Sequence, residues 1–265
     1  MIRLGVNSVL FKAFPFAEAA AAIKLAGYDG VEISALQGMC EHLDPMNYKS
    51  QKAELLSVME ANGLAFLSTE VASLDRERLL HSFEACADLG IPVVNVGPGG
   101  KSDEPDELGK SIETLVDRAE LAKTYNITLC CKAHVGCSVY NTPTTLEMMK
   151  GVAADCFGVD MDPSHIWRAG EDPAEALPKV IKRVKHIHIR DCKGKGPSPG
   201  EPAMQACGRG DIDLWGYFKA MADSGYDGPV CLEVIGPDQT MTAASIIAAE
   251  SYGYMNAILK KLGAR

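Results

Sequence analysis

The sequence lacks three features that would point to particular classes of protein. No apolar run reaches the roughly 18 residues that a membrane-spanning helix needs, and residues 1–6 form a strand pattern without the apolar core of a signal peptide. Positive charge is also scarce, because 35 acidic residues outnumber 26 lysines and arginines and give a net charge of -9. An acidic surface repels phosphate backbones and anionic lipids, so we expect neither a nucleic acid nor a membrane as a partner.

Cysteines with metal-binding spacing are absent as well. None of the nine cysteines belongs to a C-x-x-C pair, which argues against a thiolate zinc site. Their number is odd, and several fall inside predicted strands. This pattern favours free thiols that are buried as small apolar side chains, and a cytoplasmic protein.

The sequence does have the length and the repeating pattern of a large barrel. Of its 265 residues 47% are hydrophobic, which is enough for a sizeable core. Apolar strands are predicted at 2–6, 29–34, 64–69, 92–97, 127–132, 157–162, 185–190 and 229–234. Amphipathic helices are predicted at 16–26, 47–62, 75–89, 107–125, 143–154, 173–182, 213–224 and 241–261. Strict alternation implies parallel pairing, and it predicts one domain, residues 1–265, folded as a (β/α)8 TIM barrel.

A doubly wound open sheet is the alternative architecture for the same alternation. Such a sheet usually carries a glycine-rich phosphate loop after its first strand, and Asn7-Ser8-Val9-Leu10 is no such loop. The glycine-rich segment 96–100 follows the fourth predicted strand and lacks the G-x-G-x-x-G spacing. The barrel is therefore the favoured interpretation.

Ionisable residues gather at the C-terminal ends of the predicted strands, where the active sites of barrels lie. Alternate residues of a barrel strand point inward, so the last inward residues face the site. A charged group there is costly to bury unless it is paired or binds a metal. The residues at these ends are Glu70, Lys132, His134, Asp160, Asp162, His186, His188, Arg190 and Glu233.

Four phrases of the sequence occur in a recognisable order and spacing. They are Asp162-Pro163-Ser164-His165, residues 186–191 (HIHIRD), residues 208–213 (GRGDID) and Leu232-Glu233-Val234. Together they resemble the xylose-isomerase-like superfamily of sugar isomerases and epimerases, over essentially the whole chain. That group includes tagatose and psicose epimerases, hydroxypyruvate isomerases, inosose dehydratases and, more distantly, endonuclease IV. The resemblance implies an enzyme with a small sugar or sugar-derived substrate.

The resemblance also implies a metal site. In that family a Glu, an Asp, a His and a Glu from four consecutive strands hold one divalent metal, and the last three match Asp162, His188 and Glu233. A mixed oxygen and nitrogen set suits Mn²⁺, Mg²⁺, Co²⁺ or Zn²⁺. The metal would stabilise the enediolate that forms when an α-proton leaves, and Glu233 could also act as the base. The further residues expected to contact substrate are Glu70, His134, His165, Trp167 and Arg190.

Lys132 departs from the family pattern, because it stands where the first glutamate is expected. A protonated lysine cannot ligate a metal, and its charge repels a dication. Lys132 could replace the charge of the metal and pair with Asp162 and Glu233. It could instead be carboxylated and become an oxygen ligand, or it could have a depressed pKa and serve as a catalytic base or Schiff-base lysine. Glu70 could also supply the missing ligand.

Several functions fit these residues. The first prediction is an isomerase or epimerase that abstracts an α-proton from a ketose or related polyol, with Glu233 and Lys132 as catalytic residues. An inosose-type dehydratase or a 3-keto-sugar lyase begins with the same step. A non-catalytic sugar-binding or accessory subunit is an alternative of another functional class. The chain could also form a homo-oligomer. The endonuclease IV branch is rejected, because the histidines it needs on the second and fourth strands are missing and the chain is acidic.

Overall fold

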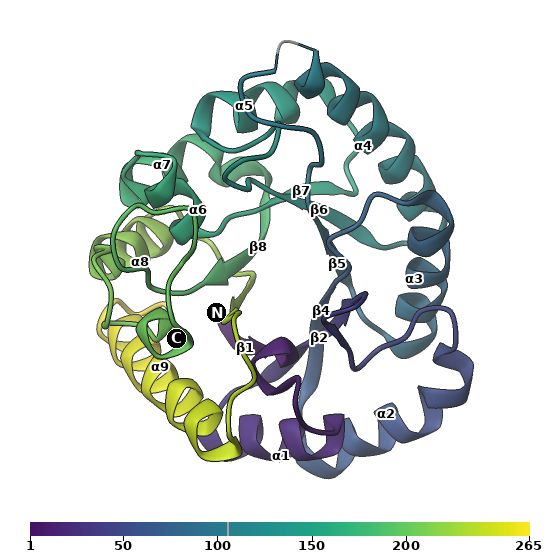
Figure 1. Cartoon of the computed structure of the whole chain (residues 1–265), viewed down its shortest axis with the longest axis vertical. Helices are drawn as coiled ribbons and strands as arrows, with labels where there is room; N and C mark the ends of the chain where they lie inside the picture. The colour runs from purple at the N-terminus through teal and green to yellow at the C-terminus, as the bar shows by residue number, and fades with distance from the viewer. Residues whose placement is uncertain (105) are drawn as a thin grey trace.

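The computed structural model describes residues 1–104 and 106–265, and its centre is a closed ring of parallel strands surrounded by helices (Figure 1). The barrel strands are β1 (Arg3–Asn7), β2 (Gly30–Leu36), β4 (Ala65–Glu70), β5 (Val93–Val96), β6 (Thr128–Lys132), β7 (Phe157–Asp160), β8 (Val184–Ile189) and β9 (Pro229–Leu232). Each strand pairs in parallel with the next, and β9 pairs with β1 to close the ring. The predicted (β/α)8 TIM barrel is therefore confirmed.

The predicted helices are present, with ends that differ by a few residues. They are α1 (Phe16–Ala26), α2 (Tyr48–Asn62), α3 (Arg76–Leu89), α4 (Glu107–Thr124), α5 (Thr142–Gly151), α7 (Pro173–Val180), α8 (Leu214–Asp223) and α9 (Met241–Lys261). Local sequence explains their ends: Gly27 ends α1 with a left-handed φ of 105°, and the Asn141 side chain accepts the Thr144 N–H to begin α5. None of the helices in the described ranges is long and apolar enough to cross a membrane.

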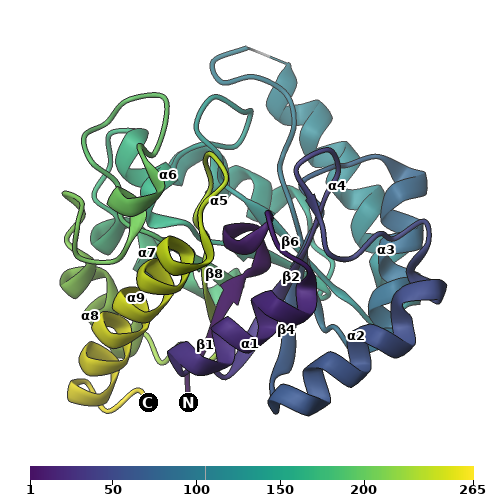
Figure 2. The ribbon, with the colours of Figure 1, turned by 60° about the horizontal axis from the view of Figure 1, so that its bottom comes forward.

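The structure adds short elements that the sequence pattern did not predict. They are β3 (Cys40–Glu41), which pairs antiparallel with β2, the helix α6 (Pro163–Arg168), and the 3-10 turns η1 (Ser8–Phe11), η2 (Ile181–Arg183) and η3 (Pro202–Gln205). The two chain ends lie together at one end of the barrel, where Ile2 N–H donates to the Ala264 carbonyl at 3.1 Å (Figure 2). The catalytic face of a barrel lies at the opposite, C-terminal ends of the strands.

Two strands end two residues earlier than predicted, so that Asp162 and Glu233 lie just outside them. The strand predicted at 157–162 ends at Asp160, and the strand predicted at 229–234 ends at Leu232. Pro163 begins α6, and the Asp162 side chain caps this helix by accepting the Ser164 N–H at 2.8 Å. Asp162 therefore lies outside β7 as the N-cap of α6, and its placement at the end of the predicted strand 157–162 was wrong.

Asp191 organises the long segment 192–212 that follows β8. Its Oδ1 accepts the N–H groups of Cys192 at 2.8 Å and Ile212 at 3.2 Å, and its Oδ2 accepts that of Gly208 at 3.0 Å. Three backbone donors on one buried carboxylate fix both ends of the segment. The phrase at residues 208–213 therefore has a structural role.

Replacing Gly210 by alanine tests this role. A β-carbon at this position would overlap the Asp191 carboxylate and lie 2.5 Å from the Cys192 nitrogen. We expect Gly210→Ala to lower the free energy of unfolding by about 1–3 kcal/mol, measured by urea denaturation. Gly196→Ala is the matched control, because a β-carbon at 196 meets no atom within 4 Å. Equal stabilities of the two variants would contradict the prediction.

Candidate active site

A cavity of about 280 Å³ lies at the C-terminal ends of the barrel strands and is lined by many of the predicted residues. Its polar lining comprises Glu70, Lys132, His134, His165, Arg190 and Glu233. Leu36, Met39, Ala72 and Ile235 form an apolar side. The structure therefore brings together residues from five different strand ends, as the sequence analysis expected of a barrel site.

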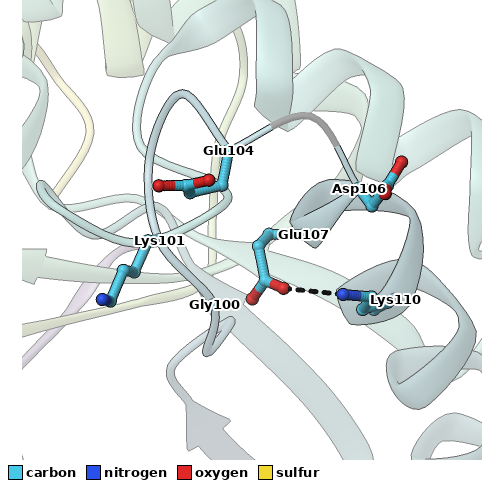
Figure 3. Close-up of a pocket in the computed structure, with 6 residues that line it drawn as sticks. All are labelled: Gly100, Lys101, Glu104, Asp106, Glu107 and Lys110. Atoms are coloured by element: carbon cyan, nitrogen blue, oxygen red, sulfur yellow. Dashed lines mark hydrogen bonds and ion pairs between the residues drawn. The ribbon is translucent and has the colours of Figure 1, made fainter.

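A larger hollow of about 640 Å³ lies beside the start of α4 (Figure 3). Lys101, Glu104 and Asp106 in its lining are exposed, and Lys110 Nζ donates to Glu107 Oε1 at 2.9 Å. Exposed charges of both signs are solvated, and no buried ionisable side chain lines this hollow among the described residues. We therefore assign the candidate site to the cavity above the strand ends.

Lys132 lies at the centre of the charged residues in that cavity. Its Nζ donates to Glu70 Oε1 at 2.8 Å and to Glu233 Oε1 and Oε2 at 3.0 and 3.1 Å, and it lies 3.4 Å from His188 Nδ1. Burial alone would lower the pKa of Lys132, but the carboxylates of Glu233 and Glu70 raise it above its usual range. Lys132 is therefore a buried ammonium, which disfavours the interpretation that a depressed pKa makes it a base.

The two carboxylates on Lys132 differ in their protonation. Burial and the negative charge of Glu233 raise the pKa of Glu70 to about 7. Glu70 also accepts a hydrogen bond of 2.7 Å from the Asn7 side chain. Burial would raise the pKa of Glu233 too, but Arg190 and Lys132 hold it well below its usual range. Glu233 is therefore a carboxylate at neutral pH, and Glu70 is close to half protonated.

Arg190 is the second cation of the site. Its Nη2 lies 2.8 Å from Asp162 Oδ2, 2.9 Å from His165 Nε2 and 3.2 Å from Glu233 Oε2. Burial and the neighbouring Arg190 charge keep the pKa of His165 well below its usual value, so His165 is neutral. The expected pairing of Asp162 with Lys132 was wrong, because Arg190 from the adjacent strand end reaches Asp162 instead.

His134 completes the polar wall of the cavity. Its ring packs against that of His165, with the ring centroids 4.0 Å apart. Burial and the charge of Lys132 lower the pKa of His134. His134 and His165 therefore offer two neutral imidazoles at the position where the sequence analysis expected contacts with substrate.

A second group of charges lies beneath Lys132, deeper in the barrel. His188 forms an ion pair with Glu32 through Nε2, and its Nδ1 lies 2.6 Å from Asp160 Oδ2. Burial would lower the pKa of His188, but Asp160 and Glu32 raise it well above the usual value. Asp160 Oδ1 also lies 3.0 Å from His186 Nδ1. Both ring nitrogens of His188 are therefore engaged by carboxylates.

The divalent metal that the resemblance implies needs several carboxylate and ring-nitrogen atoms around one point. Carboxylates and ring nitrogens close enough to share an ion do occur: the atoms of Glu32, Glu70 and His188 lie within 4.8 Å of one another, as do those of Asp160, His186 and His188. The expected set of Asp162, His188 and Glu233 forms no such group within the described ranges. A dication among these carboxylates would also adjoin the Lys132 ammonium, which repels it. The carboxylates and histidines at the strand ends therefore do not fit a divalent metal while the Lys132 ammonium lies among them.

Trp167 lies outside the lining of the cavity. Its indole Nε1 donates to the Gly194 carbonyl at 2.9 Å, and Lys195 Nζ lies 4.1 Å from the ring centroid. The expected contact of Trp167 with substrate is therefore not supported, because the side chain is used to hold the segment after β8.

The sequence analysis did not predict the contacts that three residues make at this site. Asn7 binds Glu70, and Glu32 and Asp160 bind His188 from both sides. The sequence did contain a signal for Glu32 and Asp160, because both are charged residues inside otherwise apolar strands. Asn7 had only its position at the end of the first strand.

The comparison with protein families agrees with this fold. Residues 20–254 match the family described as xylose isomerase-like TIM barrel, and the chain belongs to this family. The resemblance expected from the four sequence phrases is thereby confirmed.

Two kinds of named protein are similar to the chain. An inosose dehydratase of Clostridium perfringens is 25% identical over 251 residues, which cover 82% of each sequence. The structure of an L-ribulose 3-epimerase has a TM-score of 0.78 at 19% identity and covers 99% of this chain and 96% of that one. The structure of the probable 3-DHS dehydratase AsbF, involved in petrobactin synthesis, from Bacillus anthracis has a TM-score of 0.77 at 16% identity, with 96% and 98% coverage. The chain thus resembles an inosose dehydratase in sequence, and it shares its fold with an epimerase and a dehydratase.

Proposed function

We propose that this chain is a dehydratase of the inosose type, which removes an α-proton from a cyclic polyol ketone and eliminates a β-hydroxyl as water. The observation that carries the proposal is the meeting of Glu70, Glu233, Lys132 and Arg190 at one cavity. The resemblance to inosose dehydratases supports this reaction over the isomerase or epimerase that the sequence analysis placed first. All of these reactions share the first step.

The contacts suggest a role for each side chain. Glu233, the ionised carboxylate, takes the α-proton. Lys132 and Arg190, which both line the cavity, donate hydrogen bonds to the carbonyl oxygen as it becomes negative. Glu70 gives its proton to the β-hydroxyl, whose bond to carbon breaks as the carbon–carbon double bond forms, and water leaves.

A small substrate without a phosphate group fits this cavity best. The volume of about 280 Å³ lies just below the range of roughly 300–1,000 Å³ that is typical of ligand sites. Lys132 and Arg190 are already paired with Glu70, Glu233 and Asp162. A phosphate dianion would therefore have to compete with buried carboxylates for both cations.

Turnover in deuterated water tests the proposal. We expect an inosose to yield a product that has lost one water molecule, detected by mass spectrometry. The second candidate is a 3-epimerase, which is favoured by the two carboxylates on Lys132 Nζ, since two acid–base groups can serve two faces of one carbon. An epimerase would place deuterium in a substrate of unchanged composition. A sugar-binding subunit would give neither result and would contradict the proposal.

The pH profile gives a second test. Because burial and Glu233 raise the pKa of Glu70 to about 7, Glu70 keeps its proton below that pH and loses it above. The proposed acid is then lost, so we expect kcat/KM to fall about tenfold per pH unit above about 7. Glu70→Gln should lower the rate and remove this decline. If the decline persists in Glu70→Gln, another group is the acid.

A further inference from the structure

Lys132 Nζ, on a side chain at the end of β6, lies where groups from three other strands converge. Lys132 is the last residue of β6, Glu70 ends β4, His188 lies in β8, and Glu233 directly follows β9. The ammonium lies within 3.1 Å of both carboxylates and 3.4 Å from the imidazole. A lysine that only occupied space would extend its ammonium toward water, whereas the Lys132 side chain is only 6% exposed.

Arg190 holds the remaining carboxylate of the expected metal set. Its Nη2 lies 2.8 Å from Asp162 Oδ2 and 3.2 Å from Glu233 Oε2. Both carboxylates of that set are therefore neutralised by cations that belong to the chain. Lys132 and Arg190 together bring two positive charges, which equal the charge of one divalent ion.

We propose that the Lys132 ammonium, assisted by Arg190, replaces the divalent metal, so that this site works without a metal ion. The electrophilic role of Lys132 rests on the proposed function, but the exclusion of metal rests only on the contacts described above. An ammonium is a compact point charge with three donors on a flexible stem. It can turn one N–H from a carboxylate to a substrate oxygen, which is the task that a Lewis acid would otherwise perform.

The test compares the wild-type protein with two variants at one position. Lys132→Glu adds a carboxylate to Glu70 and Glu233 and removes the repelling charge. Lys132→Gln removes the charge without adding a ligand. Each protein is stripped with chelator and dialysed against Co²⁺. Bound metal is then measured by elemental analysis, and the visible d–d spectrum of Co²⁺ reports coordination by protein ligands. Turnover by the wild type is measured before and after the stripping.

We expect the wild type to retain less than about 0.1 equivalent of Co²⁺ and Lys132→Glu to retain about one equivalent with a ligand-field spectrum. Lys132→Gln should bind much more weakly than Lys132→Glu. One equivalent of Co²⁺ in the wild type would overturn the proposal, and this measurement is decisive even if Lys132→Glu does not fold. A folded Lys132→Glu protein without Co²⁺ would show that Lys132 is not what excludes the metal. A metal-free wild type without turnover would refute the proposed function alone.

Discussion

Replacing Glu233 by glutamine is expected to reduce turnover by about 10²–10⁴-fold while the barrel stays folded. The amide has the shape of the carboxylate but cannot accept the α-proton. It also leaves Arg190 and Lys132 with one anionic partner fewer, so their hydrogen bonds rearrange around the cavity. Steady-state kinetics give the loss in kcat, and far-UV circular dichroism with urea denaturation shows whether the fold persists.

The matched control for this change is Glu250→Gln. Glu250 forms an ion pair with Arg209 on the exposed surface, outside the cavity lining. The chemical change is identical, yet we expect wild-type kinetics because exposed ion pairs contribute little. An active Glu233→Gln enzyme would refute the assignment of Glu233 as the base.

Lys132→Ala is expected to lower both activity and stability. Turnover should fall at least tenfold, on the scale of one lost acid–base or electrophilic group, because no ammonium remains to stabilise the enediolate. Glu70 and Glu233 would be left as buried carboxylates without their shared partner. Breaking a buried ion pair costs about 3–5 kcal/mol, so the urea midpoint should fall clearly at neutral pH.

Lys219→Ala serves as the control, since Lys219 pairs with Asp223 on the exposed face of α8 and should tolerate the loss. Two measurements separate the alternative roles of Lys132. Borohydride treatment in the presence of substrate would trap a Schiff base, and an adduct on Lys132 would refute its role as a non-covalent charge. A rate close to that of the wild type for Lys132→Ala would mean that Lys132 only fills a vacated ligand position.

The fold was predictable because its signals are local. Alternating strand and helix patterns implied parallel strands. Gly27 marks a helix end by its left-handed backbone, and Asn141 marks a helix start by its side-chain cap. The short α6 was missed although Pro163 follows an aspartate, a combination that favours the first turn of a helix. The predicted strand 157–162 was extended to Asp162, and that error misplaced this residue.

The membership of the site was largely predictable, whereas its pairing was not. Strand ends in a barrel converge, so Glu70, Lys132, Arg190 and Glu233 could be grouped from their positions alone. Which carboxylate each cation reaches depends on strand register and side-chain length, which the sequence does not display. Arg190, with the longer side chain, spans to Asp162 and Glu233, and Lys132 contacts Glu233 and Glu70.

The proposed replacement of the metal by the Lys132 ammonium has a consequence for how the protein becomes active. A cation carried by a side chain is delivered when the chain folds, in fixed stoichiometry, and its occupancy does not vary with the nutritional supply of trace elements. Mismetallation, in which a wrong ion of higher intrinsic affinity enters a site, has no counterpart at such a centre. In return, the strength of this electrophile is fixed by the amino-acid sequence and cannot be adjusted by exchanging one ion for another.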